Sequence, residues 1–157
     1  MKRNLLILTA SLLLSGFAFN QNYNTALGFK GGFPGFAAFN VKHMFNETGA
    51  IEGSIGGGPN HLWLQGLYEW NHDIQSGFSW YYGVGADLGF WTNRYDYYYR
   101  DKPYNGGYGG IDGVIGIEYT FEKIPLNLAV DAVPNIRVFP YVGFNFYGNV
   151  AVRFAIK

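Results

Sequence analysis

The side chains that most often carry catalysis or metal binding are few in this sequence and unfavourably spaced. His43, His61 and His72 form neither a His-x-His nor a His-x-x-x-His pair, and cysteine is absent, so the sequence predicts no metal site. His61 with Asp112 is the one acid–base pair that we nominate, and an ordinary polar surface accounts for both residues as well. We therefore expect no catalytic residue, no metal and no cofactor.

Charged side chains form the first pattern with chemical content, because they recur on one side of alternating apolar runs. They are Lys30, Lys42, Glu52, Glu69, Asp87, Asp112, Glu118, Asp131 and Arg153. If this side of each run lies inside a confined space, the charges must pair with one another, since an unpaired buried charge is costly. We expect a structural network of ion pairs, and the alternative is a narrow path for protons or cations.

A tyrosine-rich polar segment forms the second pattern. Its candidate contact residues are Arg94, Tyr95, Tyr97, Tyr98, Tyr99, Arg100 and Lys102. Tyrosine and arginine are typical of adaptable contact surfaces, and the cations could bind phosphate oxygens. The segment belongs to a long polar connection, 92–109. It is either the end of strands that extend past a membrane, with solvent-exposed aromatic side chains, or a surface for a specific partner.

The elements that must position these residues are strands, because hydrophobicity alternates with period two along most of the chain. The predicted strands cover 23–30, 37–45, 51–56, 62–70, 79–90, 111–121, 126–133 and 149–156. Short Gly-, Pro- and Asn-containing turns separate most of them, and the two long connections are 92–109 and 134–147. We predict an all-β, eight-stranded antiparallel up-and-down barrel.

Side-chain size indicates which face of the barrel lies inside. One face carries Phe, Tyr, Trp, Leu, Ile and Val, whereas the charged face is otherwise mostly Gly, Ala, Ser and Asn. An eight-stranded barrel is only wide enough for side chains to fill, so the small charged face fits the lumen and the bulky face must point outward. This arrangement predicts a transmembrane barrel with a filled polar lumen; a soluble barrel or sandwich is the alternative.

The run from Trp80 to Phe90 has the length that a membrane requires. Its eleven residues rise roughly 25 Å when tilted, which matches the apolar band of a membrane barrel. We predict aromatic girdles at its two ends, Trp80 with Tyr82 and Phe90 with Trp91.

The hairpin turns also predict pairs within the lumen. The short turn at 46–49 places Lys42 opposite Glu52, and the neighbouring last strands suggest that Arg153 pairs with Asp131. An even number of strands places both chain ends on the same side of the barrel.

The first eighteen residues have the pattern of a secretory signal peptide. Lys2 and Arg3 precede a ten-residue apolar run, Leu5 to Leu14, which is too short for a spanning helix, and small residues precede a cut after Ala18. We expect residues 1–18 to be removed and 19–157 to form one domain. The whole chain has 14% charged residues, against about 25% on average, and a formal net charge of zero, so nothing favours nucleic acid binding.

The stretches IGIEYTF (115–121) and IPLNLAVD (124–131) resemble the paired late strands of the small eight-stranded outer-membrane β-barrel proteins of Gram-negative bacteria, the OmpA/OmpX-like "outer membrane protein beta-barrel domain". The resemblance implies this fold and a location in the cell outer membrane, in contact with its lipid. There, Arg94, Arg100 and Lys102 could reach the phosphates of lipopolysaccharide. One departure is that such barrels usually end on an aromatic residue, whereas here Phe154 is followed by Ala-Ile-Lys.

The function that we expect is non-enzymatic, either structural or a surface interaction made through connections 92–109 and 134–147, by a monomer. The alternatives are a narrow channel through the charged lumen and an enzyme that modifies outer-leaflet lipid.

Overall fold

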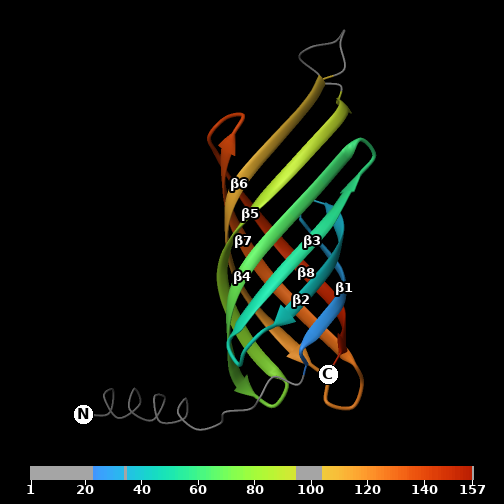
Figure 1. Cartoon of the computed structure of the whole chain (residues 1–157), viewed down its shortest axis with the longest axis vertical. Helices are drawn as coiled ribbons and strands as arrows, with labels where there is room; N and C mark the ends of the chain where they lie inside the picture. Colours follow the sequence, from blue (N-terminus) through green and yellow to red (C-terminus); the bar gives the residue numbers. More distant parts are fainter. Residues whose placement is uncertain (1–22, 34, 95–103, 157) are drawn as a thin grey trace, which may run out of the picture.

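The computed structural model of the chain describes residues 23–33, 35–94 and 104–156, which form a closed antiparallel barrel (Figure 1). Its strands are β1 (Thr25–Phe33), β2 (Phe36–Met44), β3 (Gly49–Gly58), β4 (His61–Gln75), β5 (Phe78–Arg94), β6 (Tyr104–Thr120), β7 (Leu126–Phe139) and β8 (Gly143–Ile156). Each strand pairs with the next, and β1 closes the barrel against β8. The predicted fold class is confirmed. The described residues contain no helix that could cross a membrane, a finding that bears only on helices.

The two ends of the barrel differ. Thr25 pairs with Ile156, so the chain enters and leaves at one end, which we call the terminal end (Figure 1). The connections 45–48, 76–77 and 121–125 also lie there. At the opposite end, the far end, β5 and β6 extend beyond the other strands. The far end therefore has an uneven rim, higher over β5 and β6 than over the β1–β2 hairpin.

The late strands are longer than the sequence pattern predicts. The predicted connection 92–109 is reduced to 95–103, because β5 continues to Arg94 and β6 begins at Tyr104. The predicted long connection 134–147 is wrong, since β7 runs to Phe139, β8 starts at Gly143, and only 140–142 lie between them.

The alternation of buried and exposed residues explains why β7 and β8 continue through this region. Asn135 is buried and Ile136 exposed on β7, and Phe144 and Phe146 are exposed on β8. Pro134 has no N–H to donate, and the β6–β7 register leaves it without a partner on β6 while it pairs with Phe146 on β8. A proline that suggests a chain break is thus accommodated inside a strand.

The barrel is apolar outside and polar inside. Large hydrophobic side chains from every strand are exposed, for example Phe29 at 71% and Ile117 at 54%. Inward positions carry small residues, several of them alanine, and buried charges such as Lys30 and Arg153, each 1% exposed. This is the reverse of a water-soluble barrel, whose core is apolar and whose surface is polar.

The lumen is narrow enough to demand glycine at its closing seam. A Cβ atom at Gly28 of β1 would overlap the carbonyl oxygen of Val152 on β8. By contrast, a Cβ at Gly53 or Gly66, on the outward face, meets no atom within 4 Å. The inward face is therefore close-packed, whereas parts of the outward face have room for additional side chains.

Candidate functional site: the barrel lumen

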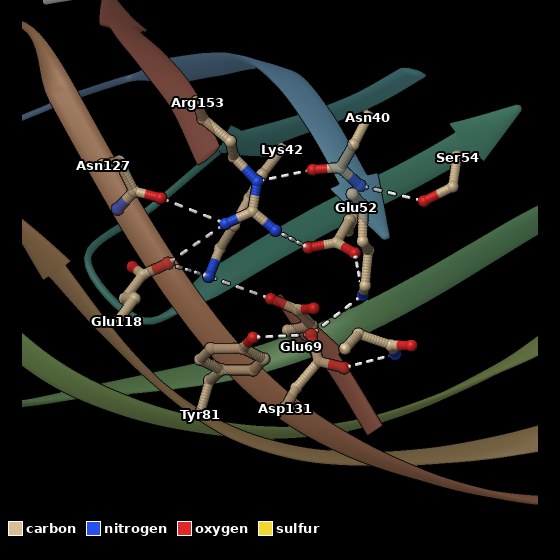
Figure 2. Close-up of polar contacts among 12 residues, drawn as sticks. Asn40, Lys42, Glu52, Ser54, Glu69, Tyr81, Glu118, Asn127, Asp131 and Arg153 are labelled. Carbon is tan, nitrogen blue, oxygen red and sulfur yellow. Dashed lines mark hydrogen bonds and ion pairs between the residues drawn. The ribbon is translucent and has the colours of Figure 1, made fainter. Parts of the chain in front are cut away.

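A network of ion pairs fills the lumen toward the terminal end, because Lys42, Glu118 and Arg153 lie near the terminal ends of their strands. We call this network the ionic plug (Figure 2). Its members are Lys30, Lys42, Glu52, Glu69, Glu118, Asp131 and Arg153, all with side chains at most 1% exposed. They come from strands all around the barrel, so their side chains meet near its axis.

Each cation of the ionic plug bridges two acids. Lys30 Nζ lies 2.7 Å from Glu52 Oε1 and 2.9 Å from Asp131 Oδ2. Lys42 Nζ lies 2.9 Å from Glu69 Oε2 and 3.0 Å from Glu118 Oε2. Bridging lets three cations serve four acids, which limits the cost of burying an excess of negative charge.

Arg153 is the most heavily bonded member of the plug. Its guanidinium donates to Glu52, to Asn40 Oδ1 and, at 3.1 Å, to Asn127 Oδ1, and it lies 3.7 Å from Glu118 Oε2 (Figure 2). A planar guanidinium has several N–H groups in fixed directions, so it can hold partners on different strands at once. Arg153 of β8 thereby links β2, β3, β6 and β7.

Buried hydroxyl and amide groups complete the plug. Tyr23 Oη donates to Glu118 Oε1 at 2.9 Å, and Tyr81 Oη donates to Asp131 Oδ2 at 3.0 Å. Lys42 Nζ also donates to Asn71 Oδ1 at 2.6 Å and lies 4.2 Å from the centre of the Tyr81 ring. These contacts give the plug both hydrogen bonds and cation–π attraction in a space without water-exposed side chains.

Of the two pairs predicted from the hairpins, one is right in register only, and the other is wrong in register and partner. Lys42 does stand opposite Glu52, but its ammonium pairs with Glu69 and Glu118. Arg153 stands opposite Asn127, and the predicted Arg153–Asp131 pair is replaced by Arg153 with Glu52 and Glu118. Long side chains reach across a narrow lumen, so the nearest strand does not decide the partner.

Two further acids, Asp87 and Asp112, lie above the plug toward the far end and are held differently. Asn135 Nδ2 donates to both, at 3.0 Å and 2.7 Å. Trp63 Nε1 donates to Asp87 at 3.1 Å, and Gln65 Nε2 donates to Asp112 at 2.8 Å. Among the described side chains, no cation lies within ion-pair distance of either acid.

An aromatic cavity of about 280 Å³ opens above these acids at the far end, and we call it the mouth cavity. Its side chains come from six strands: Phe36, His61, Trp63, Trp91, Tyr108, Arg137 and Tyr147. The His61 ring stacks on those of Trp91 and Tyr108, with centroids 5.2 and 5.9 Å away, and a ring nitrogen lies 3.1 Å from Tyr108 Oη.

The residues of the two predicted girdles lie on different faces of the barrel. Trp80, Tyr82 and Phe90 are exposed on the outer face, and Trp80 and Tyr82 belong to a ladder of stacked rings with Trp70 and His72. Trp91 is not part of a girdle, because it has the same inward phase as Gly89 and lines the mouth cavity.

Other predicted residues lie outside the described part of the chain. The signal peptide 1–18 and the contact residues Tyr95, Tyr97, Tyr98, Tyr99, Arg100 and Lys102 are among them. Arg94 is the last residue of β5, opposite Tyr104. The described residues contain no group of three or more His, Asp or Glu that could hold a metal ion.

The mouth cavity is the part of the lumen that sequence reasoning missed. Arg137 and Tyr147 fall in the predicted connection 134–147 and so have no predicted direction. The signal was present: both follow the inward alternation of Asn135 and Asn149. Continuing the strand pattern through Pro134 would have placed them inside the barrel.

Comparison with known proteins supports the architecture alone. No protein-family model and no curated protein sequence matches this chain. The structure is similar to the crystal structure of the N-terminal β-barrel domain of OprF from Pseudomonas aeruginosa, with a TM-score of 0.68 and 12% sequence identity over 85% of this chain and 98% of that one. At this identity the likeness shows a shared β-barrel fold and no more.

Proposed function

We propose that the protein is a non-enzymatic, integral outer-membrane β-barrel with a structural role. The observation that carries the proposal is the inverted polarity of the barrel, with exposed Phe, Ile, Leu and Val around the outside and the ionic plug inside. So much contiguous apolar surface would not remain exposed to water, whereas it matches the hydrocarbon of a bilayer.

The closed sheet meets the second requirement of a membrane. Hydrocarbon offers no partner for a free N–H or C=O group, so a sheet can cross a bilayer only if its edges are paired. The β1–β8 register runs from Thr25 opposite Ile156 to Phe33 opposite Gly148, which pairs β1 along its whole length. Membrane lipid is thus the first partner that we propose.

The ionic plug favours a structural role over transport. Arg153, Tyr81 and Lys42 point toward one another in the lumen (Figure 2), and these three side chains and Lys30 are each at most 1% exposed. An eight-stranded barrel leaves little cross-section beyond its side chains, so such a plug opposes a continuous water path. We therefore expect no porin-sized conductance from the purified protein in planar bilayers, and steady currents of that size would favour the channel alternative.

Cell fractionation combined with gel migration tests the membrane location. We expect the protein in the outer-membrane fraction, and we expect a band in unboiled samples that shifts on boiling. Gly28→Val should lose the shifted band because its side chain overlaps β8, whereas Gly53→Val should keep it because its Cβ meets open space. Recovery of the wild type as a soluble periplasmic protein would overturn the proposal.

We further propose that the far end faces the outside of the cell, where the tyrosine-rich segment would contact lipopolysaccharide phosphates. Trypsin added to intact cells tests this orientation. We expect cleavage after Arg94 or Arg100, while Lys123, in the terminal-end connection 121–125, stays protected. Cleavage at Lys123 alone would show that the orientation is reversed.

A further inference from the structure

We propose that the mouth cavity binds a small organic anion that carries a single ring, with Arg137 as the group that recognises its charge. This inference goes beyond the structural role proposed above and does not depend on it, since it concerns the folded barrel in any membrane or detergent. The cavity has about 280 Å³ of space and is bounded by side chains of β2, β4, β5, β6, β7 and β8.

The walls of the cavity are suited to a flat apolar group. Phe36 packs against Trp63 with ring centroids 4.8 Å apart, and Trp91 packs against Tyr108 at 4.7 Å. Aromatic rings offer both faces and edges to a ligand ring, and their attraction adds to the burial of apolar area. A pocket somewhat smaller than the usual 300–1,000 Å³ range suits a one-ring molecule.

Arg137 brings a positive charge to this aromatic cavity. Its guanidinium carbon lies 4.8 Å from the Tyr108 ring centre and 5.3 Å from that of Tyr141, and Nη1 donates to Tyr141 Oη at 2.8 Å. Its Nε is buried without a hydrogen-bond partner in the described part of the chain, and no described acid forms an ion pair with it. A carboxylate would supply the missing acceptor and the missing counter-charge.

The local backbone explains why Arg137 is placed there. The β6–β7 register shifts so that Gly109 faces Phe139 while Gly110 faces Arg137, which inserts Val138 as an extra residue on β7. Such a bulge redirects the side chain beside it, and bulges are frequent at barrel rims. Here the bulge follows Arg137, which continues the inward alternation of Asn135 and lies at the rim because it is two residues before the end of β7.

The charges around the cavity predict how the ligand would lie. Asp87 stands behind the Trp63 indole, which donates to it. The ligand carboxylate should therefore stay beside Arg137 at the rim, while the ring points inward toward Trp63. A second negative group at the inner end would approach Asp87, so a monoanion should bind better than a dianion.

Benzoate is the probe that we choose, with benzyl alcohol as its neutral counterpart and terephthalate as the dianion. Binding to the folded full-length protein in a non-ionic detergent can be followed by saturation-transfer NMR and by tryptophan fluorescence. We expect saturable benzoate binding, at least about tenfold weaker binding of benzyl alcohol, and weaker binding of terephthalate. Equal affinities for benzoate and benzyl alcohol would overturn the assignment of Arg137.

Two matched pairs of variants test the site itself. Arg137→Met should weaken benzoate binding at least about tenfold, whereas Lys123→Met removes the same charge in the terminal-end connection and should leave binding unchanged. Gly58→Leu adds a side chain at a cavity-lining position where a Cβ meets no atom within 4 Å, and it should block binding. Gly66→Leu, equally free of clashes on the outer face, should not.

The shift on boiling shows whether each variant is folded, so loss of binding can be separated from loss of structure. If Arg137→Met does not fold, the Gly58 and Gly66 pair decides alone. Unchanged benzoate binding in a folded Gly58→Leu protein would overturn the proposal, as would the absence of saturable binding to the wild type.

Discussion

The ionic plug and the mouth cavity lie in the same lumen and are both built from inward-facing residues of the strands. Their buried charged groups, however, have different kinds of partner. In the plug, Lys30, Lys42 and Arg153 each bridge two carboxylates, and their side chains are fully buried. Around the mouth cavity, Asp87 accepts only from neutral donors in the described structure, and Arg137 rests on tyrosine rings.

The difference shows that barrel width alone does not decide whether a lumen is closed. Where cations and acids face each other across the axis, long side chains meet and fill it. Where the inward residues are rings and amides, the side chains line the wall and leave space, about 280 Å³ here. The plug therefore should contribute mainly to stability, and the mouth cavity mainly to recognition.

The largest expected difference between the two regions comes from removing one arginine in each. Arg153→Met leaves buried carboxylates without one of their cations and should cost about 3–5 kcal/mol of unfolding free energy. Arg137→Met loses a hydrogen bond to the solvent-exposed Tyr141 hydroxyl and ring contacts, and it should cost about 1 kcal/mol. Urea unfolding in detergent or bilayers measures both, and equal costs would mean that the plug is not held by Arg153.

A cation added outside tests the boundary between lumen and lipid. Gly66→Arg places a charge on the outer face in the middle of β4, and Gly58→Arg places one at the mouth, and both positions have room for a Cβ. We expect Gly66→Arg to cost about 2–4 kcal/mol in a bilayer and Gly58→Arg much less. If Gly66→Arg were harmless in a bilayer, the outer face would not be in contact with hydrocarbon.

Double-mutant cycles test which cation pairs with which acid inside the ionic plug. Lys30→Met with Glu52→Gln should show a coupling of about 0.5–3 kcal/mol, because the two groups lie 2.7 Å apart. Lys42→Met with Glu52→Gln should be closer to additive, although these residues stand opposite each other, since Lys42 pairs with Glu69 and Glu118. A larger coupling energy for Lys42 with Glu52 than for Lys30 with Glu52 would mean that ion pairs form between residues that stand opposite each other on neighbouring strands.

This contrast also shows how far the sequence alone could go. Alternation placed the charged residues inside and Trp80, Tyr82 and Phe90 outside, because a one-residue step in a strand changes the face. It could not assign Lys42 to Glu69, since contacts across the lumen depend on how strands far apart in sequence are stacked. The sequence pattern ended the seventh strand before Pro134, because a proline usually marks the end of a strand, and Arg137 was therefore not predicted to lie on β7.

The smallest expected difference between the two regions comes from removing one tyrosine hydroxyl group in each. Tyr81→Phe removes the donor to Asp131 Oδ2, a carboxylate that also pairs with Lys30, so the lost bond is charge-assisted and should cost about 1.5–3 kcal/mol. Tyr108→Phe removes the hydrogen bond between Tyr108 Oη and the His61 ring, which involves no carboxylate, and keeps the stacked rings, so it should cost about 0.5–1.5 kcal/mol. Both substitutions preserve ring volume, which isolates the hydroxyl group in urea unfolding. A larger loss for Tyr108→Phe would mean that the rim, and not the ionic plug, holds the lumen side chains in place.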